Sequence, residues 1–119
     1  MWGLTSTGIV SVNVINSVNN TIAATGLSTL PLNTWTHIAQ TFSTANTNNL
    51  YINGALVAST SAGTGRPMGP YIFIGASPTG TSSCKAGSIS MGQFYGSVDE
   101  FHVYGVQLNA TDICRLANP

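Results

Sequence analysis

The chain has 119 residues and a formal net charge of zero, and only 5% of its residues are charged. Soluble domains carry roughly 25% charged residues, so this composition excludes recognition of nucleic acid or of an anionic membrane surface through basic side chains. No apolar run approaches the roughly 20 residues that cross a bilayer. With 43% hydrophobic residues, the chain has enough apolar surface for one soluble domain, residues 1–119.

Short apolar segments in the first half of the chain predict strands. Residues 9–15 are almost all β-branched, residues 21–24 follow an Asn-rich turn, and residues 35–42 are long enough for a central strand. Residues 50–52 and 55–58 flank Asn53-Gly54, a dipeptide that supplies the positive φ angles of a type I′ hairpin turn. The first half therefore consists of short strands joined by turns.

The second half contains longer loops and one helix. Residues 71–74 and 97–104 are predicted strands, and the loop over residues 77–92 is rich in Ser and Gly. Asn109 and Asp112 form a capping-box pattern at the start of a short C-terminal helix. This arrangement predicts an all-β fold, an antiparallel β-sandwich with one short C-terminal helix.

Cysteines and sequons favour an extracellular or cell-surface setting. Cys84 and Cys114 lie far apart in the sequence, unlike a metal-binding pair, and we expect a disulfide that ties the Ser/Gly-rich loop to the helix. A zinc site of these two cysteines with His37 and His102 is the alternative, but it lacks a local pair of ligands. Asn19 and Asn109 each begin an Asn-x-Thr sequon, and we expect N-glycans there in a eukaryotic host.

Several segments in a fixed order carry a family resemblance. They are WTHIAQTF (35–42), LYINGALVA (50–58), YIFIGAS (71–77), FYGSVDEFHVYGVQL (94–108) and NATDICRL (109–116). This order resembles a laminin G-like domain of the concanavalin A-like lectin/glucanase superfamily. The resemblance implies a jelly-roll sandwich that recognises glycans or extracellular proteins.

The resemblance also implies missing strands. Such domains carry further strands upstream, and one of them lies beside the terminal strand, whereas only 34 residues precede Trp35 here. The strand over residues 97–104 would then be an open edge, and residues 3–15 are suited to pair with it, within one chain or between chains. Exchange between chains would make the protein a self-assembling structural subunit, as an oligomer or filament. This is the alternative to a recognition module.

Acidic residues are too few for a hydrolase. Asp99 and Glu100 are adjacent in a predicted strand and face opposite ways, whereas glycoside hydrolysis needs two carboxyls at one cleft. We therefore expect no catalytic residues and no enzyme activity. Relatives often hold a structural calcium, which assigns Asp99 as the candidate ligand by resemblance. A hydrogen bond from turn amides to Asp99 is the simpler interpretation, because calcium binding needs several carboxylates, and we expect no cofactor.

Aromatic side chains give weak candidates for ligand binding. Arg66, Tyr71 and Tyr95 could stack on a sugar and hydrogen-bond to it, although they fit ordinary loop and strand positions equally well. Trp35 opens a predicted central strand, so we interpret it as a core residue rather than a sugar platform. His37 and His102 lack serine or acid partners in a triad pattern, and we expect both to be neutral and hydrogen-bonded.

Overall fold

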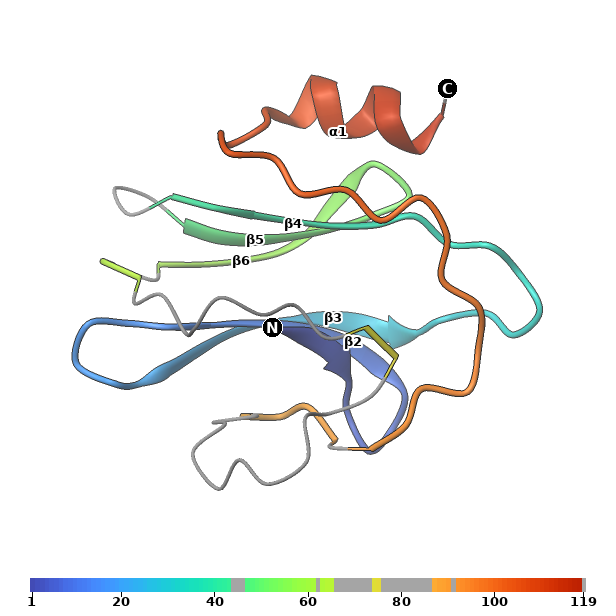
Figure 1. The fold of residues 1–119 in the computed structure, drawn as a ribbon, viewed down its shortest axis with the longest axis horizontal. Coiled ribbons are helices and arrows are strands. Elements are labelled where there is room, and N and C mark those ends of the chain that lie inside the picture. Colours follow the sequence, from blue (N-terminus) through green and yellow to red (C-terminus); the bar gives the residue numbers. More distant parts are fainter. Residues whose placement is uncertain (44–46, 62, 66–73, 76–86, 91, 119) are drawn as a thin grey trace.

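The protein is a sandwich of two antiparallel sheets with a helix outside one of them (Figure 1). The computed structural model describes residues 1–43, 47–61, 63–65, 74–75, 87–90 and 92–118. The elements in these residues are β1 (Trp2–Leu4), β2 (Ile9–Ile15), β3 (Thr21–Thr29), β4 (Ile38–Phe42), β5 (Thr47–Ile52), β6 (Ala55–Ser61) and α1 (Ala110–Ala117). One sheet has the order β1-β2-β3, and the other has the order β4-β5-β6. The predicted antiparallel sandwich with a short C-terminal helix is confirmed.

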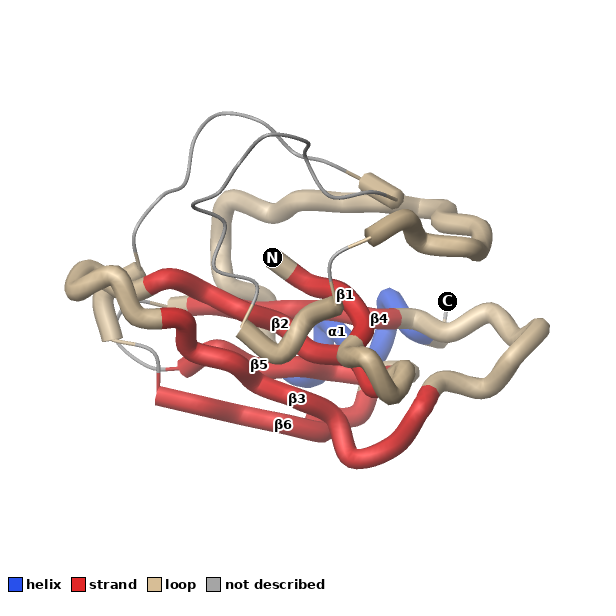
Figure 2. The backbone as a smooth tube through the Cα atoms, turned by 90° about the horizontal axis from the view of Figure 1, so that it is seen from below, coloured by secondary structure: helices blue, strands red, loops and turns tan. Residues whose placement is uncertain are grey.

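The apolar core lies between the two sheets. Val10 and Val12 of β2, Ala24 of β3 and Leu50 of β5 are buried there. Alternation along β2 directs these valines inward and Ser11 to the opposite face of the sheet. In Figure 2, β3 and β6 lie along one side of the molecule, and β3 contacts β5 and β6 across the core.

The outer face of the first sheet is polar but covered by residues 87–90. Ser11 is fully buried, and its hydroxyl lies 2.9 Å from the Thr25 hydroxyl and 3.0 Å from the Ser88 hydroxyl. The backbone N–H of Ser90 donates to the carbonyl oxygen of Leu4 at 2.8 Å. A Cβ at Gly3 would lie 2.6 Å from Cγ2 of Ile89, so this cover requires glycine in β1. On this face, buried hydroxyl groups therefore form hydrogen bonds with one another.

A buried amide joins the two sheets. The side chain of Asn48 in β5 is fully buried, and its Nδ2 donates to the carbonyl oxygens of Val12 at 2.9 Å and Ile22 at 3.3 Å. Its Oδ1 accepts a hydrogen bond from Nε2 of Gln40 in β4 at 2.7 Å. A buried amide costs free energy unless its donors and acceptor are satisfied, and here three partners satisfy them. Asn48 thereby fixes the position of one sheet on the other.

The β5–β6 hairpin turn forms as predicted and supports the helix. Asn53 and Gly54 have φ angles of 49° and 79°, as a type I′ turn requires. Oδ1 of Asn53 accepts from the backbone N–H of His37 at 3.0 Å, which ties the turn to the residue just before β4. A Cβ at Gly54 would lie 3.0 Å from Cα of Cys114, so only glycine allows α1 to approach this closely.

The capping box of α1 is confirmed. Oδ1 of Asn109 accepts from the backbone N–H of Asp112 at 3.0 Å, and the backbone N–H of Asn109 donates to Oδ2 of Asp112 at 3.3 Å. Ile113 is the buried residue of the helix. Two first-turn hydrogen bonds and one apolar contact thus define the start and the orientation of α1.

Three predictions from the sequence are wrong. β4 begins at Ile38 rather than at Trp35, and the Trp35 side chain is 71% exposed instead of lying in the core. Residues 97–104 form no strand, and all of them are exposed. Residues 3–15 are not free to pair with them, because β1 and β2 form a sheet with β3 in the same chain. High strand propensity does not make a strand without a partner to pair with. The strand predicted over residues 71–74 lies outside the described residues except for Ile74.

Candidate functional site

The most unusual surface of the molecule is formed by residues 97–104, which we call the open segment. In Figure 1 the chain that contains it runs from below the first sheet, past the strand ends, to α1 above the second sheet. Within the described residues its backbone makes a single hydrogen bond, from Glu100 N–H to Oδ1 of Asp99 at 2.8 Å. The open segment therefore leaves most of its peptide groups available for a partner.

Large apolar side chains of the open segment are in solvent. Val103 is 69% exposed, and Val98, Phe101 and Tyr104 are each exposed by 40–47%. Isolated exposed apolar residues are ordinary, whereas several within one short segment indicate an interaction surface. In a chain with so few charged residues, little electrostatic repulsion opposes association at this surface.

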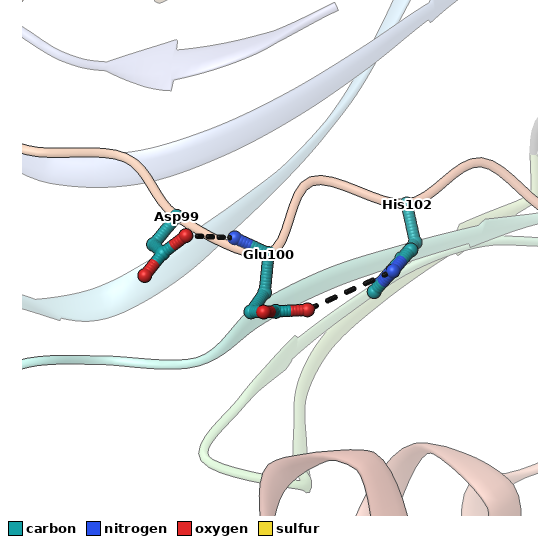
Figure 3. Close-up of polar contacts among 3 residues, drawn as sticks. All are labelled: Asp99, Glu100 and His102. Atoms are coloured by element: carbon teal, nitrogen blue, oxygen red, sulfur yellow. Dashed lines mark hydrogen bonds and ion pairs between the residues drawn. The ribbon is translucent and has the colours of Figure 1, made fainter.

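Three ionisable residues lie in the middle of the open segment (Figure 3). Oε2 of Glu100 is 3.8 Å from Nε2 of His102, and both side chains are more than half exposed. Glu100 has a φ of 50°, in the left-handed region that non-glycine residues rarely adopt. His102 and Tyr104 have ring centroids 6.2 Å apart in a tilted arrangement. The charges are thus solvated, and the backbone at Glu100 is strained.

The two adjacent acids do not form a catalytic pair. The Asp99 carboxylate accepts from the neighbouring amide, whereas the Glu100 carboxylate points along the segment toward His102 (Figure 3). No group of three His, Cys, Asp or Glu side chains that could hold a metal ion occurs in the described part of the chain. The local hydrogen bond to Asp99 agrees with the simpler interpretation of this residue, and a calcium role stays an untested prediction.

A second feature is an open groove between the end of the open segment and α1. It has a volume of about 320 Å³ and is lined by Tyr104, Leu108, Asp112, Arg115 and Leu116. Arg115 is the one Lys or Arg side chain among the described residues. The sequence analysis did not identify this groove. Asp112, Arg115 and Leu116 have the spacing of one helix face, and this pattern was a signal in the sequence that could have indicated the groove.

The histidine that precedes β4 has a buried ring nitrogen without a hydrogen-bond partner among the described residues. His37 Nδ1 and the hydroxyl of Thr36 are buried without a hydrogen-bond partner. Burial lowers the pKa of His37 below its ordinary value of 6.5 because the charged ring loses hydration. The lowered pKa agrees with the expected neutral ring, whereas the expected hydrogen bonding of the ring is not met at Nδ1 among the described residues.

The remaining predicted site residues are dispersed. Asn19 and Asn109 are exposed, in the β2–β3 turn and at the cap of α1, so both sequons are accessible. Cys114 is an exposed thiol, and its predicted partner Cys84 lies outside the described residues. Tyr95 is 89% exposed and precedes the open segment, whereas Arg66 and Tyr71 also lie outside the described residues. The disulfide, the N-glycans and the three-residue ligand site thus remain predictions.

Comparisons with known proteins establish the family. The two-sheet sandwich is the fold of lectin-like domains, and residues 2–114 match the laminin G-like family described as the concanavalin A-like lectin/glucanases superfamily. The chain belongs to this family. The described parts of the chain contain no helix with the length and apolar character needed to cross a bilayer. None of the curated proteins is significantly similar to it in sequence.

One solved structure is similar over nearly the whole chain. It is the 2.1 Å crystal structure of an S-layer domain-containing protein (residues 221–444) from Clostridium thermocellum ATCC 27405. The two are 26% identical, with a TM-score of 0.62, and the match covers 93% of this chain and 52% of the other. This chain therefore spans about half the length of that structure.

Proposed function

We propose that the chain is a non-catalytic binding module of an extracellular or cell-surface protein, and that it recognises another polypeptide. The observation that carries this proposal is the open segment, with its unpaired peptide groups and exposed Val98, Phe101 and Val103. Peptide groups give affinity when a strand is added to a protein, and side chains give specificity. The superfamily and the S-layer neighbour support the surface setting.

Among the described residues no strand lies beside the open segment, and this supports the same proposal. Laminin G-like domains are expected to place a strand beside their terminal strand, and here β1 and β2 are already paired with β3. A strand from another polypeptide would satisfy the free N–H and C=O groups and cover the apolar side chains. The module would then be completed by its binding partner.

A library of displayed 12-residue peptides, selected on the full chain, tests this function. We expect extended apolar peptides whose affinity falls by about tenfold or more on Phe101→Asp with Val103→Asp, because a buried charge replaces an apolar contact at each site. The matched control is Leu27→Asp, which changes another highly exposed apolar residue, at the end of β3. Peptides that bind the double variant as well as the wild type would contradict the proposal.

Glycan recognition at the groove is a second candidate. An aromatic ring, two leucines and an arginine beside an acid are the side chains that stack on a sugar and hydrogen-bond to it. A glycan array with the Tyr104→Ala and Arg115→Ala variants tests this site, and Tyr95→Ala is the control outside the groove lining. Binding that is lost with Tyr104→Ala but kept with Tyr95→Ala supports the groove. Loss with Tyr95→Ala alone would instead place the site at Tyr95.

A further inference from the structure

We propose that the open segment pairs with the same segment of a second copy of this chain, in antiparallel orientation and with Phe101 facing Phe101. The inference rests on the proposed polypeptide-binding function and names the partner. Among the described residues, the backbone of the open segment hydrogen-bonds only within its own central turn. A second copy supplies the complementary row of donors and acceptors without any other protein.

Symmetry restricts the register of such a pair. In a two-stranded antiparallel ribbon of identical chains, the two-fold axis lies midway between the strands. It passes between two copies of the same residue or between two copies of the same peptide group. Residues that face each other across the axis point to the same side of the ribbon. An axis at Phe101 places Glu100 opposite His102 of the second copy, and the reciprocal pair has the same composition. The two apolar residues at the ends, Val98 and Tyr104, then face one another.

Two registers whose axis lies nearer the N-terminus are disfavoured by charge. An axis at Glu100 places two Glu100 carboxylates directly opposite each other, and an axis at Asp99 does the same with two Asp99 carboxylates. Like charges in directly opposed positions destabilise a strand pair, whereas opposite charges and aromatic pairs stabilise it. The axis at Phe101 opposes no like charges, lets the Glu100 carboxylate of each copy accept a hydrogen bond from the His102 ring of the other, and adds an aromatic pair, so it fits better than these two registers.

Contacts already present in the single chain resemble those that the pair would make. Oε2 of Glu100 and Nε2 of His102 lie 3.8 Å apart within one chain, and the backbone at Glu100 is in the left-handed region. Pairing requires this residue to become extended, which relieves the strained conformation. The two contacts within the separate chains would be replaced by two contacts between the chains, and the two Phe101 side chains would cover each other.

This geometry closes upon itself. The same patch is used on both copies, so the product is a dimer, whereas a head-to-tail exchange between chains would propagate as a filament unless it closed into a ring. The N-terminal strands, which the sequence suggested as the exchanged element, remain in the first sheet. The expected assembly is therefore a symmetric dimer with both sandwiches intact.

The decisive experiment swaps charges between two variants of the full chain. Glu100→Lys alone opposes the introduced lysine to His102, and His102→Glu alone opposes two carboxylates. The mixture of the two variants restores an opposite-charge pair at one position and a Glu–His pair at the other. By sedimentation velocity over a concentration series at neutral pH, we expect each variant alone to dimerise about tenfold more weakly than the wild type, and the mixture to recover.

Two results would overturn the inference. They are a wild-type chain that stays monomeric at every accessible concentration, and a mixture that associates no better than its components. Peptide binding to the open segment distinguishes failure of the proposed dimer from failure of the proposed polypeptide-binding function. If peptides bind and Phe101→Asp with Val103→Asp abolishes that binding, while no dimer forms, then the partner is a strand of another protein and only the second copy is excluded. If peptides also fail to bind, the proposed function falls as well.

A disulfide trap tests the register independently of affinity. In a background with Cys84→Ser and Cys114→Ser, Phe101→Cys places two thiols opposite each other across the axis, where facing Cβ atoms in strand pairs lie about 4.5–5.5 Å apart. Asp99→Cys is the matched control, because Asp99 faces Val103 of the second copy. Rapid crosslinking of the first variant and slow crosslinking of the second are expected. Equal rates would contradict this register.

Discussion

Residues 2–61 and residues 92–108 contain similar side chains in opposite surroundings. In the first region Val12 is fully buried, and its strand pairs on both sides with β1 and β3. In the second region Val103 is 69% exposed, and its backbone has no ladder among the described residues. Both regions are rich in β-branched and aromatic residues. The difference shows that such residues make a strand only where a neighbouring strand satisfies their peptide groups.

The largest expected effect is at the amide that joins the two sheets. Asn48→Ala should lower the free energy of unfolding by about 3 kcal/mol, because it leaves a cavity and removes hydrogen bonds to two carbonyl oxygens and the Gln40 amide. Asn49→Ala is the control, because the side-chain hydrogen bonds of Asn49 among the described residues go to the Thr41 and Ser59 hydroxyls, on the outer face. Urea denaturation measures both. Equal losses would show that the buried amide has no special role.

The same substitution in both regions tests the comparison directly. Val12→Ala should lower the free energy of unfolding by about 2 kcal/mol, because two buried methyl groups are lost and a cavity remains. Val103→Ala should change it by less than about 0.5 kcal/mol, because the side chain is already in solvent. Both variants are measured by urea denaturation at concentrations that keep the chain monomeric. A comparable loss at Val103 would show that the open segment packs in solution.

The cap of α1 should have a smaller and local effect. Asn109→Ala removes the acceptor for the Asp112 N–H and should destabilise the helix by about 1 kcal/mol. Faster hydrogen exchange over residues 110–117, with little change in β2, would report this. Asn118→Ala at the other end of α1 is the control, and its effect should be smaller. Unchanged exchange in the Asn109 variant would indicate that packing of Ile113 alone holds the helix.

The smallest expected effect is the dependence of folding stability on pH that His37 causes. Burial lowers its pKa, so the unfolded chain takes up the proton first as pH falls through 6.5. Stability from the neutral ring is therefore complete above that pH and declines toward pH 5. His37→Gln should reduce the decline between pH 7 and pH 5, measured by urea denaturation at each pH. A decline that is identical in the wild type and the variant would exclude His37 as its cause.

The sequence predicted features whose causes are local. The turn at Asn53-Gly54 and the capping box at Asn109 depend on neighbouring residues, and both are confirmed. The strand over residues 9–15 is also confirmed, because β1 and β3 pair with it. The strand over residues 97–104 was wrong because its existence depends on a partner that no local pattern reveals. Trp35 was assigned to the core for the same reason, since burial requires a covering element. The groove at Tyr104 was missed because it combines residues from two elements.

The sandwich itself is held together by uncharged groups, and this has a consequence for the ionic conditions in which it can work. Its two sheets are joined by the Asn48 amide, and its outer face is covered through hydroxyls of Ser11, Thr25 and Ser88. Dissolved salt screens interactions between charges over about 10 Å at 0.1 M, whereas these amide and hydroxyl contacts of the described residues involve no ion pair. The fold should therefore keep its stability from dilute buffer to brine, while the Glu100–His102 pairing between copies weakens as salt is added. Ionic strength would then act on assembly alone.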